Sequence, residues 1–132
     1  MEVRDYHEKA REVARTILRA YGPEPAAYDD AEQQIVAAFV YGANEALAQE
    51  LGVEGWEATI AGMAVLCGPL GFSPEMAGAA LDYFADCAET GDNELMETVI
   101  QAGADAYHLL NQPADIARYL SKAVAYLRQR GE

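Results

Sequence analysis

Hydrophobic side chains recur every three or four positions along most of this sequence, which is the spacing that places them on one face of an α-helix. Alternating patterns of the kind found in β-strands are scarce, and alanine, the strongest helix former, is abundant. We therefore predict an all-α fold, a compact bundle of about six helices joined by short loops. The predicted helices cover Asp5–Tyr21, Tyr28–Leu51, Glu54–Cys67, Pro74–Thr90, Glu94–Leu110 and Ala114–Arg130.

Glycine and proline mark the breaks between these segments, most clearly at Gly22-Pro23 and Gly68-Pro69. Ser73 before Pro74 forms a typical helix start, with a capping hydroxyl followed by proline in the first turn. Short connections favour antiparallel packing of consecutive helices. Residues 1–132 are expected to form a single helical domain, since their number suits one hydrophobic core.

The second and third helices are apolar on most sides, so we predict that these two form the centre of the fold. The other helices have one apolar face each. The residues expected to point inward are Met76, Ala80, Tyr83, Phe84 and Cys87 in the fourth helix, Leu95, Val99, Ala102, Ala106 and Leu109 in the fifth, and Ile116, Leu120, Ala123 and Leu127 in the sixth.

The charged residues are distributed unevenly. The chain carries 22 acidic and 9 basic residues, a net charge of −13, and all nine basic residues lie within residues 4–19 and 118–130. The segment between them has seventeen carboxylates and no lysine or arginine. Such a surface disfavours direct binding of nucleic acid or of an anionic membrane and favours a basic protein partner. Two alternatives stay open: an ordinary solvated acidic surface, and adaptation to high salt.

Two acidic clusters are the candidate partner-binding surfaces. The first begins on the outward face of the fourth helix and continues across the Gly91 turn into the fifth, and the second surrounds the Gly52 turn. Tyr28, Trp56 and Tyr107 would add contact area if exposed and would otherwise belong to the core. The first cluster contains Asp82, Asp86, Glu89, Asp92, Glu94 and Glu97, and the second contains Glu45, Glu50, Glu54 and Glu57.

The residues that usually carry catalysis or bind metals form no recognisable constellation. Asp105 and His108 are one helical turn apart, but Arg4 stands where a matching pair with His7 would need a carboxylate. Cys67 and Cys87 are too far apart for a CxxC motif and are expected to be free thiols. We therefore predict no catalytic residues, no metal and no cofactor. The charged N-terminal segment lacks the apolar region of a secretory signal, and no apolar stretch reaches the length of a membrane span, which together indicate a cytoplasmic protein.

The stretch FVYGANEALAQELG at residues 39–52, together with the size and acidity of the chain, resembles the small helical immunity proteins of bacterial polymorphic-toxin and type VI secretion systems. The resemblance implies a cognate toxin as partner, with a basic surface or active site such as that of a nuclease, and no catalysis. Other hypotheses are an adaptor or chaperone for a secreted effector, an acidic mimic of nucleic acid, and an enzyme. The sequence leaves open whether the protein is a monomer or a dimer.

Overall fold

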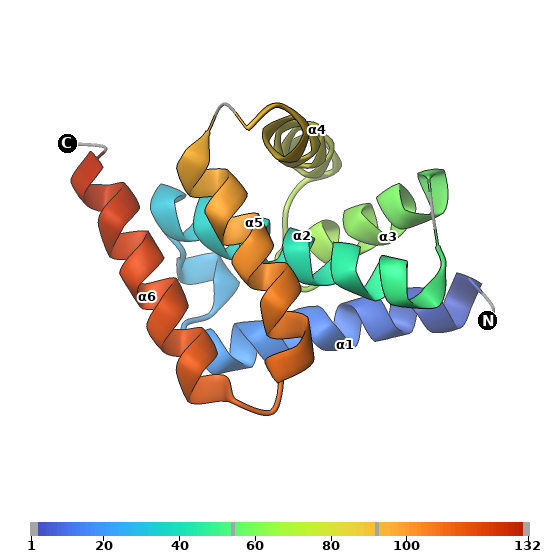
Figure 1. The fold of residues 1–132 in the computed structure, drawn as a ribbon, viewed down its shortest axis with the longest axis horizontal. Coiled ribbons are helices and arrows are strands. Elements are labelled where there is room, and N and C mark those ends of the chain that lie inside the picture. The colour runs from blue at the N-terminus through green and yellow to red at the C-terminus, as the bar shows by residue number, and fades with distance from the viewer. Residues whose placement is uncertain (1–2, 54, 92, 131–132) are drawn as a thin grey trace.

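The computed structural model describes residues 3–53, 55–91 and 93–130, and these form six α-helices and two short 3₁₀ turns without a strand (Figure 1). The predicted all-α class is confirmed. The fifth helix is shorter than predicted, because its last turn tightens into a 3₁₀ turn. The elements are α1 (Val3–Tyr21), η1 (Pro25–Ala27), α2 (Asp30–Leu51), α3 (Trp56–Cys67), α4 (Pro74–Thr90), α5 (Glu94–Ala106), η2 (Tyr107–Leu109) and α6 (Pro113–Arg130).

Local capping chemistry fixes where the helices begin and end. Asp29 accepts a hydrogen bond from the backbone N–H of Glu32, whose carboxylate accepts one from the backbone N–H of Asp29, so a complete capping box starts α2. The hydroxyl oxygen of Ser73 accepts from the N–H of Met76 at the start of α4, which confirms the predicted cap. Gly52 ends α2 in the left-handed conformation that glycine adopts without strain.

Helix α2 lies at the centre of the fold, as predicted, and α5 crosses it closely (Figure 1). The two backbones touch at Gly42 and Gly103. A Cβ atom at Gly42 would overlap the carbonyl oxygen of Ile100, and one at Gly103 would overlap that of Phe39. The crossing therefore depends on two glycines, one on each helix.

The prediction that α3 is central was wrong, because α3 packs at the edge of the bundle. Only three of its residues are buried, although the helix contacts α1, α4 and α2, whereas Trp56 is 71% and Ile60 is 43% exposed. An apolar composition on both sides of α3 is therefore not accompanied by burial of both sides. The buried residues of α3 are Ala61, Val65 and Leu66.

The inward face of α4 was also predicted about one position out of register. Met76 and Tyr83 are exposed, while Ala77 and Leu81 are buried beside the correctly predicted Phe84 and Cys87. In the fifth segment the exposed Leu109 belongs to η2 and not to the core, and Met96, Ile100 and Gly103 are buried instead. Figure 1 shows α4 nearly end-on while α3 lies across the view, so these consecutive helices cross instead of packing antiparallel.

The two helices that carry the basic residues, α1 and α6, pack against each other. Arg128 near the end of α6 pairs with Asp29 through its Nε and Nη2 atoms at 2.9 and 2.6 Å, and its Nη2 lies 3.3 Å from Glu32. The hydroxyl of Tyr21 donates to the other oxygen of Glu32 at 2.6 Å. This network joins the ends of α1 and α6 to the start of α2 and uses two of the acidic residues of the middle segment.

Candidate functional site

Three of the six residues predicted to bind a partner form a stripe along α4. Asp82, Asp86 and Glu89 are four and three positions apart, so they share one face of the helix, and all three are exposed. The described ion pairs join Arg118 to Asp115 and Arg128 to Asp29 and Glu32, so none of them involves these three side chains. The stripe therefore carries negative charge that no described cation neutralises.

The rest of the first cluster is placed differently. Glu97 turns back toward the preceding loop, where a Cβ at Gly91 would lie 3.3 Å from its Oε2 atom. Glu94 lines a shallow groove between α5 and α6 together with Lys122 and Arg130. Asp92 lies outside the described residues. The structure thus places Glu94 beside basic side chains, in a groove that the stripe on α4 does not line.

The second cluster also divides between two sides of the molecule. Burial and then the carboxylates of Glu45 and Glu57 raise the pKa of Tyr6, whereas burial and then Glu50 raise the pKa of Tyr107 in η2. Glu54 lies outside the described residues. Glu45 and Glu57 therefore approach the α3 side of α2, and Glu50 approaches the side covered by η2.

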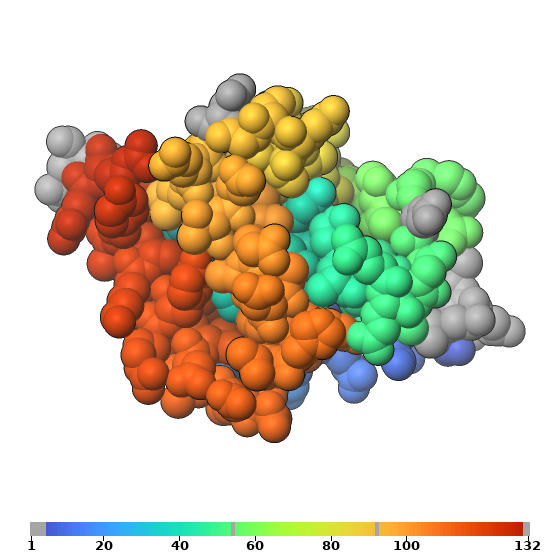
Figure 2. All heavy atoms as spheres, viewed as in Figure 1, coloured from blue at the N-terminus to red at the C-terminus, as the bar shows by residue number. Residues whose placement is uncertain are grey.

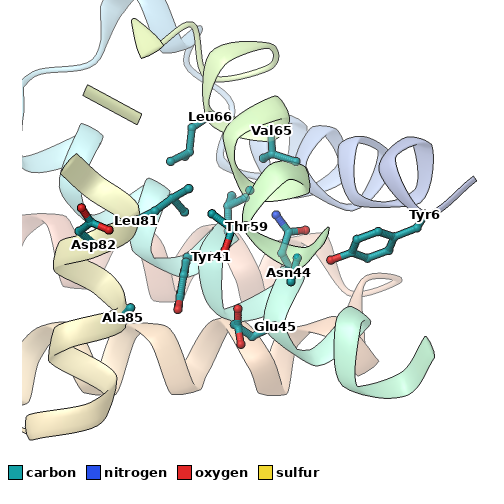
Figure 3. A pocket seen from close by; sticks show the side chains of 13 residues that line it. Tyr6, Tyr41, Asn44, Glu45, Thr59, Val65, Leu66, Leu81, Asp82 and Ala85 are labelled. Carbon is teal, nitrogen blue, oxygen red and sulfur yellow. The ribbon is translucent and has the colours of Figure 1, made fainter. Parts of the chain in front are cut away.

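Glu45 of α2 and Asp82 of α4, one residue from each predicted cluster, line the same hollow (Figure 3). The hollow lies where α2, α3 and α4 meet and has a volume of about 120 Å³. Figure 2 shows α3 and α4 on two sides of the exposed part of α2. None of the described residues lining the hollow is basic. Its polar lining consists of Tyr6, Tyr41, Asn44, Glu45, Thr59 and Asp82, and its apolar walls include Val65, Leu66 and Leu81.

Asn44 is the lining residue that sequence reasoning missed. Its side chain is only 8% exposed, and its Oδ1 atom is buried without a hydrogen-bond partner among the described residues. Figure 3 shows the hydroxyl of Tyr6 directed toward this amide. A buried acceptor without a donor costs about 1–3 kcal/mol. The available signal was a single amide within the long apolar run of α2.

The surroundings of the hollow disfavour additional negative charge. Burial raises the pKa of the Glu45 carboxyl. Burial and, to a lesser extent, the nearby Glu45 carboxylate raise the pKa of Tyr41 to about 12. The pKa of Tyr6 is raised by burial and then by Glu45 and Glu57. Glu45 is therefore a carboxylate that keeps access to water while its charge is partly desolvated, a setting that favours a cationic ligand.

The three aromatic candidates have different environments. Tyr28 is a core residue, Tyr107 is half-buried, and Trp56 is exposed at the start of α3. Ile60 lies one turn after Trp56 on the same face of the helix, and Thr59, which lines the hollow, stands between them in sequence. Neither Trp56 nor Ile60 lines the hollow, so this exposed apolar surface is a separate part of the α3 surface.

The described residues contain no group of three or more histidine, cysteine, aspartate or glutamate side chains placed to hold a metal ion. Cys67 and Cys87 are free thiols, as expected, with Cys87 buried and Cys67 half-buried. Within the described part of the chain, no helix combines the length and the apolarity that crossing a membrane requires.

The fold and this surface define a class: a small all-α acidic protein with un-neutralised carboxylates and an exposed tryptophan. The sequence matches the family model described as Immunity protein 48 over residues 6–125, and the chain belongs to this family. The prediction of an immunity protein is therefore confirmed at the level of the family. Comparisons with curated proteins and with solved structures give no match.

Proposed function

We propose that this protein neutralises a cognate toxin by covering a basic surface or active site with the side of the molecule formed by α3, α4 and the exposed part of α2. Membership of an immunity protein family supports a toxin as the partner. We choose this surface because the carboxylates of Asp82, Asp86 and Glu89 lie on one exposed face of α4 and no described ion pair neutralises them. In this role the protein acts by binding and needs no catalytic residue.

Charge and apolar contact would act together on this side. Clustered carboxylates speed the encounter with a basic partner, whereas a buried aromatic anchor slows dissociation. Trp56 is 71% exposed and has the size and amphipathic character of such an anchor. Its position at the start of α3, the helix that packs against α4, supports an interface that includes both Trp56 and the acidic stripe.

The first experiment identifies the toxin and tests neutralisation. The tagged protein is used to capture partners from its native lysate at low and high salt, and each basic partner is then expressed in bacteria with and without this protein. We expect one partner to arrest growth and co-expression to restore it. Capture of partners that are harmless alone, or growth arrest that co-expression leaves unchanged, would contradict the proposal.

The second experiment tests the surface. The variant Asp82→Lys, Asp86→Lys and Glu89→Lys is compared with a variant of equal net charge, Glu8→Lys, Glu12→Lys and Glu24→Lys, whose exposed acidic residues lie elsewhere. Electrostatic steering contributes about 10- to 1,000-fold to association rates. We expect the α4 variant to lose at least about tenfold more in the association rate than its control. Equal losses would show that total charge matters and that the stripe is ordinary solvated surface.

An adaptor for a secreted effector is the second candidate, and one observation favours it. Among the described residues, six large hydrophobic side chains are exposed, and two of them, Met76 and Tyr83, line one groove beside Phe72 and Phe84. An adaptor would bind its effector without restoring growth, so the co-expression experiment separates the two functions. The exposed residues are Trp56, Ile60, Met76, Tyr83, Leu109 and Tyr126.

A further inference from the structure

The described lining of the hollow between α2, α3 and α4 has no cation, and its donors, the hydroxyls of Tyr6 and Tyr41 and the NH2 group of Asn44, are outnumbered by its acceptor oxygens. Asn44 Oδ1 is buried and unpartnered among the described residues, and Glu45 and Asp82 add two carboxylates. The Thr59 hydroxyl already donates to the carbonyl of Gly55, so its oxygen is left as an acceptor. A ligand that satisfies this lining must bring several donors and a positive charge.

The volume and the apolar walls of the hollow restrict the chemical class of ligand that it can hold. A volume of about 120 Å³ accommodates several water molecules and therefore a guanidinium group with part of its alkyl stem. Leu66 and Leu81 provide apolar surface on which the methylene groups of such a stem can pack. Guanidinium carries five donors in a planar fork and is less strongly hydrated than ammonium, so arginine suits a lining of dispersed, partly desolvated acceptors better than lysine.

We propose that this hollow receives an arginine side chain of the toxin, whose guanidinium group pairs with Glu45 and lies against the side-chain amide of Asn44, with Asp82 at the rim. The inference rests on the proposed function for the source of the arginine, but the binding chemistry of the hollow does not depend on it. The exposed surface of Trp56 and Ile60, on the same helix as Thr59, would then contact other residues of the partner.

The hollow is tested first without the toxin. N-acetyl-arginine amide is titrated into ¹⁵N-labelled protein at constant ionic strength, and N-acetyl-citrulline amide, its neutral isostere, serves as the matched control ligand. We expect shifts of the Asn44 side-chain amide and of the Thr59 and Gly62 backbone amides with arginine only. Shifts elsewhere, or equal shifts with citrulline, would overturn the proposal.

Variants of the hollow make the test specific. Charged hydrogen bonds contribute enough that losing one weakens binding about tenfold or more. The variant Glu45→Gln with Asp82→Asn is expected to lose at least that factor for the arginine probe. Glu50→Gln, the same type of change on the opposite side of α2, is expected to leave it unchanged. An equal loss with Glu50→Gln would assign the effect to overall charge and overturn the site.

Affinity measurements with the toxin then identify which arginine occupies the hollow. Each arginine of the toxin is replaced by glutamine, and affinities are measured with the native protein and with Glu45→Gln. We expect one toxin arginine whose loss matters much less in the Glu45→Gln background, which is the signature of a direct pair. Full toxin binding by Glu45→Gln would overturn this inference while leaving the proposed function intact. Failure to neutralise any toxin would instead remove the proposed function, and the arginine titration would still report on the hollow.

Discussion

Replacing Gly42 by alanine should destabilise this protein strongly, although alanine is the better helix former. The added Cβ would overlap the carbonyl oxygen of Ile100 and lie 2.8 Å from its carbonyl carbon. Both atoms belong to the backbone of α5, so no side-chain rotation relieves the overlap and the two helices must move apart. Gly78 of α4 provides the control, because a Cβ there meets nothing within 4 Å and its φ is not positive.

The expected magnitude combines two opposing terms. Overpacking a tight core costs about 1–3 kcal/mol and occasionally more, and contact with backbone belongs at the upper end of that range. Exchanging glycine for alanine within a helix contributes about 1 kcal/mol in the opposite direction. The net loss for Gly42→Ala is therefore about 2 kcal/mol or more, while Gly78→Ala should gain roughly 0.5–1 kcal/mol.

These energies translate into melting temperatures. At about 2.1 cal/mol/K per residue, a chain of 132 residues unfolds with an entropy of roughly 0.28 kcal/mol/K. Gly42→Ala should thus lower Tm by about 7 °C or more, and Gly78→Ala should raise it by about 2–4 °C. Thermal unfolding followed by far-ultraviolet circular dichroism measures both. A Gly42→Ala protein as stable as the native one would refute the close crossing.

The glycine on the other helix sharpens this test. Gly103→Ala should also lower Tm, because its Cβ would overlap the carbonyl oxygen of Phe39. Once one added methyl group has separated α2 from α5, the second meets less resistance. The double variant should therefore lose less than the sum of the two single losses, as residues that share one contact do. Strict additivity would mean that the two glycines do not share a crossing.

Three further predictions concern individual side chains. Glu45→Gln should raise Tm at pH 7, because a raised pKa means that the ionised form of Glu45 opposes folding. The gain in Tm should vanish below about pH 4, where the carboxyl is protonated in both the folded and the unfolded protein. Hydrogen bonds from the backbone of Glu32 and then from Arg128 lower the pKa of Asp29. The ionised Asp29 therefore stabilises the fold above its ordinary pKa, and this stabilisation is lost as the pH falls through the lowered pKa. Asp29→Asn removes this contribution, so the stability of the variant should fall less steeply with decreasing pH. Trp56→Ala should weaken toxin binding by about 30-fold and leave Tm nearly unchanged, as expected for an exposed interface anchor. Tyr126→Ala on α6, the control, should leave toxin binding unchanged. A loss of Tm in Trp56→Ala as large as that of a core deletion would contradict this prediction.

The elements of this fold were predictable because their signals are local. The capping hydroxyl of Ser73, the carboxylates at the start of α2 and the glycine that ends it all act within one helical turn. The position of α3 was not predictable in this way. Its apolar residues suggested burial on all sides, but a helix at the edge of a bundle has the same composition when its outer face is available for a partner.

The hollow was only half predictable. Glu45 and Asp82 were both singled out as acidic candidates, yet they belonged to separate clusters, because sequence spacing relates residues within one helix and not across three. The convergence depends on where α4 crosses α2 and α3. Asn44 lay within a segment described only by its apolar faces, and its unpartnered oxygen becomes evident only when the neighbouring helices are in place.

The acidic residues of this chain therefore fall into at least two groups. Asp29 and Glu32 are neutralised by Arg128 and hold α1, α2 and α6 together, so their charge is used within the fold. Burial raises the pKa of the Glu45 carboxyl and no described ion pair includes it, so we expect its ionised form to lower the stability of the fold. Residues that lower stability in this way are common at functional sites. A Glu45→Gln protein that unfolds at a higher temperature but binds its partner less tightly would place Glu45 in the second group, and an Asp29→Asn protein that is less stable yet binds normally would place Asp29 in the first.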